Sequence, residues 1–170
     1  MIINFLIIIQ GKIMSYTEII KFDKNGKPHS GGRVQNASQG SYSIWNLLTN
    51  KYLNRDFNNI DPKKEQETWN LFRDSRLTDT EKIVLGSTFD YVLIKKDDIN
   101  QVVDAYKKFC KEFSASERFP LSLVKQRVIL EKLESDEDCI AVGFHQNSVS
   151  CDMWNDYNCL TGEKHWYLFE

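Results

Sequence analysis

The sequence predicts an α+β fold: a mostly antiparallel sheet, built of C-terminal strands, that packs against several amphipathic helices forming a single layer on one face. Apolar side chains between Ile99 and Phe113 recur at helical spacing, and this is the clearest helical stripe in the chain. Bulky and small residues alternate over 140–144, which indicates a strand with one bulky face. The aromatic run 166–169 is β-prone, and its burial requires a place in the sheet.

The N-terminal half is predicted to hold one strand followed by helices. An Asn25-Gly26 pair is a strong turn signal and closes the first strand. The stretch after it is rich in Gly, Ser, Asn and Gln and lacks apolar periodicity, so we expect a long surface loop. Asp61 and Pro62 are typical of a helix start, and Thr78 is typical of a helix cap. In order, we expect a strand over 16–22, a loop over 27–42, helices over 43–54 and 61–73, and a short helix after Thr78.

The C-terminal half alternates helices and strands. A strand near residue 90 is apolar on both faces toward its end, as in a central strand that is covered on two sides. Gln146-Asn147 is predicted to turn the chain between two strands. In order, we expect a strand over 89–94, helices over 97–113 and 120–133, strands over 140–144 and 148–151, a loop over 152–162, and a terminal strand over 166–169.

The domain organisation is predicted to be simple. The chain has 170 residues, which suits one domain, and we assign that α+β domain to 14–170. Residues 1–13 are interpreted as an extension ahead of a true start at Met14, because codons for Gln10-Gly11-Lys12 can spell a purine-rich ribosome-binding site. If the segment is genuine, its apolar side chains could instead add an edge strand.

Charge and cysteine content exclude several functional classes. Lys plus Arg number 22 against 24 Asp plus Glu, a net charge of −2, so we expect no nucleic-acid binding. No stretch reaches the roughly 20 apolar residues of a membrane span, so we expect no membrane partner. The four cysteines form no C-x-x-C pair, which is typical of reduced thiols in a cytoplasmic protein. No cofactor motif is present, and we predict no cofactor.

Reactive side chains are densest near the C-terminus. His145, Cys151, Cys159 and His165 could in principle form a tetrahedral zinc site, although their spacing matches no common zinc module. A catalytic alternative pairs Cys151 or Cys159, as the nucleophile, with His145 or His165, as the base. Asp152 or Asp156 would then orient the histidine. Against both stands the usual fate of free cysteine, which is burial as a small apolar residue.

The Gly31-Gly32-Arg33 sequence has the composition of an anion-binding loop, with adjacent glycines and a cation. It lacks both standard nucleotide-binding glycine motifs. The alternative is a flexible turn without a ligand. We retain Arg33 as a candidate binding residue.

Large aromatic side chains occur in the acidic loop 152–162. Trp154 and Tyr157, with Asp152 and Asp156, are predicted to form a protein-binding surface, because interface hot spots favour Trp and Tyr within a polar rim. The carboxylates would favour a basic partner. The alternative, which the sequence leaves open, is that Trp154 folds back to cover the sheet.

These observations favour a small intracellular binding protein of bacterial or phage origin, which inhibits a protein partner by occluding its surface, as immunity proteins do. The first alternative is a small enzyme that uses the Cys/His/Asp region and binds an anionic substrate at Gly31-Gly32-Arg33; the sequence weighs against it because no catalytic signature surrounds those residues. A further alternative is a purely structural subunit. Neither the partner nor the oligomeric state is specified by the sequence.

Overall fold

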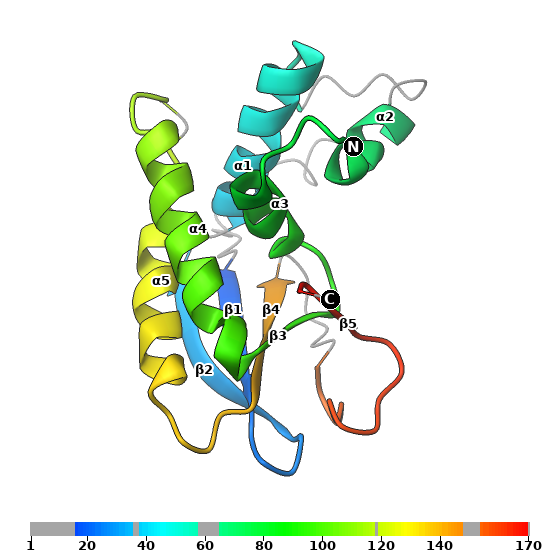
Figure 1. Cartoon of the computed structure of the whole chain (residues 1–170), viewed down its shortest axis with the longest axis vertical. Helices are drawn as coiled ribbons and strands as arrows, with labels where there is room; N and C mark the ends of the chain where they lie inside the picture. Colours follow the sequence, from blue (N-terminus) through cyan, green and yellow to red (C-terminus); the bar gives the residue numbers. More distant parts are fainter. Residues whose placement is uncertain (1–15, 36–37, 58–64, 118, 148–153, 170) are drawn as a thin grey trace, which may run out of the picture.

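The computed structural model describes residues 16–35, 38–57, 65–117, 119–147 and 154–169. Within these ranges, a five-stranded sheet and five α-helices form the α+β fold that the sequence predicts (Figure 1). The elements in order are β1 (Tyr16–Phe22), β2 (Pro28–Gln35), α1 (Ser38–Leu53), α2 (Glu65–Asn70), α3 (Asp79–Gly86), β3 (Val92–Lys95), α4 (Ile99–Glu112), α5 (Leu121–Glu134), β4 (Ala141–Asn147) and β5 (Trp166–Tyr167); short 3₁₀ turns cover Leu71–Arg73 and Lys96–Asp98.

The sheet has the strand order β2-β1-β4-β3-β5. β1 pairs antiparallel with both β2 and β4, and β3 pairs antiparallel with β4. Among the described strands, only β5 runs parallel to its neighbour, β3. The mostly antiparallel prediction is therefore confirmed, and the terminal aromatic strand is paired as expected. The sheet is not built of C-terminal strands alone, because β1 and β2 come from the N-terminal region.

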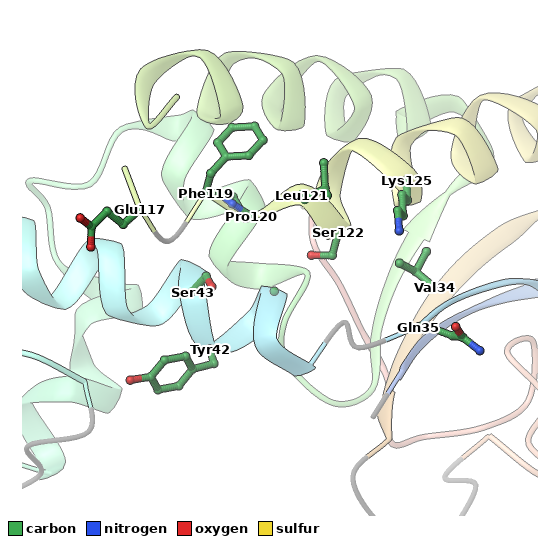
Figure 2. A pocket seen from close by; sticks show the side chains of 11 residues that line it. Val34, Gln35, Tyr42, Ser43, Glu117, Phe119, Pro120, Leu121, Ser122 and Lys125 are labelled. Atoms are coloured by element: carbon green, nitrogen blue, oxygen red, sulfur yellow. The ribbon is translucent and has the colours of Figure 1, made fainter. Parts of the chain in front are cut away.

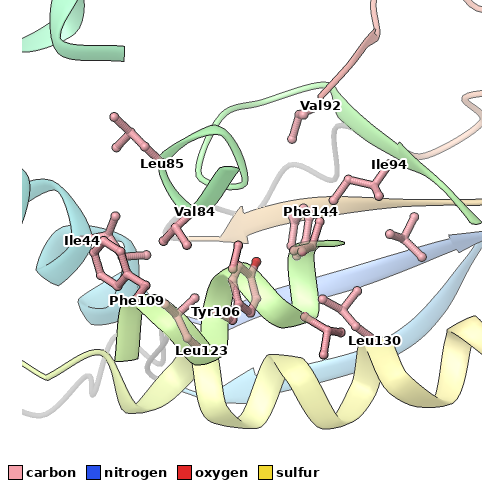
Figure 3. Close-up of a cluster of buried hydrophobic side chains, with 14 of the residues drawn as sticks. Ile44, Val84, Leu85, Val92, Ile94, Tyr106, Phe109, Leu123, Leu130 and Phe144 are labelled. Atoms are coloured by element: carbon pink, nitrogen blue, oxygen red, sulfur yellow. The ribbon is translucent and has the colours of Figure 1, made fainter. Parts of the chain in front are cut away.

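Residues of four helices, α1, α3, α4 and α5, pack in a core on one face of the sheet. β-strand side chains alternate between faces, so Ile19, Val142 and Phe144 point toward the helices. There they meet the inward stripe of α4, whose Tyr106 and Phe109 are almost fully buried (Figure 3). The main core therefore lies between the helical layer and the sheet.

The opposite face of the sheet carries a second, smaller core. Its strand residues are Ile20, Phe22, Leu93 and Ala141. No helical residue belongs to this cluster among the parts of the chain that are described; instead Trp154 and Cys159, from the segment before β5, complete it. The loop segment thus covers the apolar side chains on this face of the sheet, as the helices do on the other face.

The predicted loop over 27–42 is wrong, because residues 28–35 form β2 and residues 38–42 form the first turn of α1. The two glycines of β2 explain why apolar periodicity was missing. A Cβ atom on Gly31 would meet Leu133 at 2.8 Å, and one on Gly32 would meet Ile129 at 2.9 Å, so the glycines let α5 approach the strand closely. The strand is bulged at this point, where the register shifts between Ile19 and Ile20 of β1.

Other boundaries follow the predictions with local differences. Thr78 caps α3 as expected, and Glu81 completes a reciprocal capping box. β4 continues to Asn147, so the turn predicted at Gln146-Asn147 is wrong. The expected strand over 148–151 and the segment 1–13 lie outside the described residues. No described helix has the length and apolar content to cross a membrane.

Candidate interaction loop

The segment 154–165 connects the second core to β5 and is called here the anchored loop. It lies against the turn between β1 and β2. The Cys159 amide donates to the Gly26 carbonyl at 3.0 Å, and the Asn158 side-chain amide donates to the Asn25 carbonyl at 2.8 Å. Gly26 has a φ of +75°, and a Cβ atom there would collide with Leu160, so glycine is needed both for the turn and for the close approach. Figure 1 shows the loop (orange to red) projecting beyond the sheet near this hairpin.

Trp154 anchors the beginning of the loop. Its side chain is 1% exposed and its indole N–H donates to the Phe144 carbonyl at 3.0 Å. The ring lies edge-on to Phe22 and Tyr91, with centroids 5.2 and 5.3 Å away. It also covers Gly143, where a Cβ atom would stand 2.8 Å from the indole. Of the two alternatives left open by the sequence, the structure has the one in which Trp154 folds back over the sheet, so its prediction as an exposed contact residue is wrong.

Tyr157 holds the end of the loop in place. Its hydroxyl lies 2.6 Å from Nδ1 of His165 and accepts a hydrogen bond from the His165 amide at 3.0 Å. The Tyr157 ring also stacks edge-on against Trp154 and packs under Gly162. Inside the loop, the Gly162 amide donates to the Asn158 carbonyl at 2.7 Å. The loop is therefore fixed at both ends and across its middle.

The outer side of the loop exposes an apolar residue among polar ones. Leu160 is 62% exposed, the highest value among the large hydrophobic side chains in the described part of the chain. Asp156 and Glu163 are exposed in the same loop. Asp156 adopts a left-handed φ of 58°, which turns the chain just after the buried Trp154. Leu160 lies within the loop expected over 152–162, but nothing in its local sequence pattern separates an exposed leucine from a buried one.

The histidine and cysteine residues considered for a zinc or catalytic site do not all lie close together. Ala141 of β4 pairs with Phe22 near the hairpin turn, and His145 lies four residues further along the strand, about 13 Å away. The main-chain amide of Cys159, by contrast, is hydrogen-bonded to Gly26 in the turn itself. His145 and Cys159 are thus separated along the sheet, while His165 is held by Tyr157. Cys151 and Asp152 lie outside the described residues. Among the described residues there is no cluster of three or more His, Cys, Asp or Glu side chains that could bind a metal ion.

The described thiols are poor nucleophiles at neutral pH. Burial raises the pKa of Cys139 to about 11. Burial also raises the pKa of Cys110 and of Cys159 above the usual thiol value. Because the thiolate is the reactive form, these three side chains are suited to packing rather than to covalent catalysis.

Arg33 lies on β2, away from the anchored loop. Its guanidinium donates to Glu18 at 3.1 Å and stacks 4.0 Å above the Tyr16 ring. Ser30 also donates to Glu18, at 2.6 Å. Since Gly31 and Gly32 form part of β2 and lie close to α5, neither the anion-binding loop nor the flexible turn considered for Gly31-Gly32-Arg33 is formed.

A groove of about 560 Å³ lies at the other end of the β1–β2 hairpin. It runs between the first turns of α1 and α5, and the end of β2 also lines it (Figure 2). Phe119, Pro120 and Leu121 contribute apolar surface, and Ser43 contributes a hydroxyl. Sequence reasoning did not identify this site, because its walls come from three segments that only the fold brings together.

Comparison with known proteins gives no relative. No protein-family model, no curated protein and no solved structure matches this chain.

Proposed function

We propose that the protein is a binding protein that docks on another protein through the anchored loop and inhibits it by covering its surface. The observation that carries the proposal is the exposed Leu160 on a loop that is held by the buried Trp154 and Cys159 before it and by the Tyr157–His165 hydrogen bonds after it. A surface that is already ordered loses little conformational entropy on binding, so one apolar anchor contributes more to affinity than it would on a flexible segment. Asp156 and Glu163 supply the polar rim that such interfaces usually have.

The partner in this proposal is a protein with a basic patch beside an apolar one. Exposed carboxylates on the loop attract cations across an interface and mainly speed association. Lys24 and Lys27, on the hairpin turn, are also exposed, so the partner should place its cations against the loop and not against the turn. Nucleic acid is disfavoured, since the net charge of the chain is −2.

The proposed setting is the cytoplasm of a bacterium or of a phage-infected cell. Three described cysteines, Cys110, Cys139 and Cys159, are free thiols, which a reducing compartment preserves. An inhibitor that works by occlusion needs an ordered surface and no reactive centre, and the raised pKa values of these thiols agree with that role.

The test is a comparison of three affinity baits in lysate of the source organism. Wild type and Val128→Asp should recover the same protein, and Leu160→Asp should not, because a carboxylate would be buried at the centre of the interface. Val128 is the matched control, since it is 44% exposed on α5 and receives the same substitution. Equal recovery by Leu160→Asp would show that the anchored loop is not the binding surface.

Charge reversal gives a second measurement on the recovered partner. Asp156→Lys with Glu163→Lys should slow association, with an effect that shrinks at high salt. Asp104→Lys with Glu112→Lys, on exposed positions of α4, provides the same change in net charge. Equal effects from the two double variants would contradict a basic patch facing the loop.

A further inference from the structure

The groove between α1 and α5 is a second site that the anchored loop does not use. Val34 and Gln35, at the end of β2, line it, whereas the anchored loop contacts the opposite end of the same hairpin. Its volume of about 560 Å³ falls in the range of pockets that bind small ligands. Leu121 on its rim is 57% exposed, so apolar surface is available to a ligand.

The two ends of the groove carry opposite charges. Figure 2 shows Glu117 on one side and Lys125 on the other, with Phe119, Pro120 and Leu121 between them. Both charged side chains are exposed, and neither forms an ion pair with any residue that the structure describes. A ligand that complements the groove therefore has an apolar middle, a cation at one end and a carboxylate at the other.

The neighbouring strand favours an extended ligand over a compact one. β2 is an edge strand of the described sheet, and its last residues open into the groove. An edge strand offers main-chain donors and acceptors to an extended chain that lies beside it. Main-chain pairing and the separated charges both match an extended peptide.

We propose that this groove binds an extended peptide segment of mixed charge, with its apolar side chain against Leu121, its cation at Glu117 and its carboxylate at Lys125. The site is independent of the proposed partner surface. It gives the protein a second binding function at the far end of the β1–β2 hairpin.

The test uses three blocked five-residue peptides with a central leucine. One carries lysine at one end and glutamate at the other, one carries lysine at both ends, and one carries glutamate at both ends. Binding is followed by amide chemical shifts of the ¹⁵N-labelled full chain. Wild type should bind the mixed peptide about three- to fivefold more tightly than the other two, the effect expected of exposed ion pairs. The shifts should centre on Gly40, Ser43 and Ser122.

Charge variants make the result specific. Lys125→Glu should prefer the peptide with two lysines, Glu117→Lys should prefer the peptide with two glutamates, and Leu121→Ser should weaken all three. Lys111→Glu, at an exposed position of α4 outside the groove, should leave the wild-type order unchanged. An unchanged order in the groove variants, or no saturable shift at the groove with millimolar peptide, would overturn the proposal.

Different variants test the partner surface on the anchored loop and the peptide groove, so either proposal can be refuted without the other. Leu160→Asp should leave peptide binding intact, and Leu121→Ser should leave recovery of the protein partner intact. A loss of peptide binding in Leu160→Asp would contradict an independent groove, whatever the outcome of the affinity baits.

Discussion

Replacement of Trp154 by alanine should cost about 4 kcal/mol of unfolding free energy. The side chain is 1% exposed, and aromatic side chains of this size bury about 150–250 Å², worth roughly 4–6 kcal/mol at about 25 cal/mol per Å². Measured costs of Trp→Ala in protein cores are about 3–5 kcal/mol, so we take the lower end of the range calculated from the buried area. A domain of this size has about 5–15 kcal/mol of stability, so the variant should still fold at low temperature.

The assay is urea denaturation followed by far-UV circular dichroism. Trp154→Phe keeps a ring in the core but loses the indole hydrogen bond to the Phe144 carbonyl, so it should cost about 1–2 kcal/mol. Trp69→Ala is the control: Trp69 is 44% exposed, and its loss should cost about half as much as that of Trp154. A cost below about 1 kcal/mol for Trp154→Ala, or one no larger than for Trp69→Ala, would refute the anchoring role.

Three further outcomes are expected. Glu81→Gln should cost about 2 kcal/mol at neutral pH, because the buried carboxylate accepts from Lys51 at 2.8 Å. The hydrogen bonds to Lys51 and Thr78 hold the pKa of Glu81 below its usual 4.5 despite burial, so the wild-type advantage in urea should be full above about pH 4.5 and should fade as pH falls through the lowered value. Gly143→Val should cost roughly 1–3 kcal/mol in the same assay, since its side chain would strike the Trp154 ring 2.8 Å away, and an unchanged midpoint would contradict that contact. The Cys159 thiol should react with a disulfide reagent far more slowly in the native protein than in urea, because burial raises its pKa, and equal rates would contradict its place in the second core.

The elements that the sequence predicted correctly are those whose signals lie within a short stretch of sequence. β1 was expected over 16–22 and is Tyr16–Phe22, because an apolar strand ends at a strong Asn-Gly turn. α4 was expected from its stripe, and Val102, Val103 and Tyr106 of that stripe are buried. In each case the signal, a turn after the strand or an apolar stripe along the helix, lies within the element or directly beside it.

The elements that were missed depend on distant partners. β2 has two glycines and few apolar residues, and its identity as a strand depends on pairing with β1 and on contact with Ile129 and Leu133 of α5. No window of local sequence contains that information. Strand propensity measures fit to a half-buried surface, and here the neighbouring helix supplies the surface.

The candidate site was predicted in part. The sequence indicated that the loop containing Trp154 and Tyr157 is unusual, but not which side chain would face solvent. The deciding feature is Gly143 in β4, which leaves a space that the indole fills. The alternation of bulky and small residues in that strand was visible in the sequence. Its small face leaves room for a large side chain, and this signal could have predicted that Trp154 is buried against Gly143.

The central claim is that the anchored loop is ordered before it binds anything, and amide hydrogen exchange of the free protein tests it most directly. The Cys159 amide is bonded to Gly26 and the Gly162 amide to Asn158, so both should exchange at least about a hundredfold more slowly than in an unstructured chain. Slow exchange at both amides, lost in Trp154→Ala, is the predicted result. Exchange of both amides at the unstructured rate in wild type would contradict the claim.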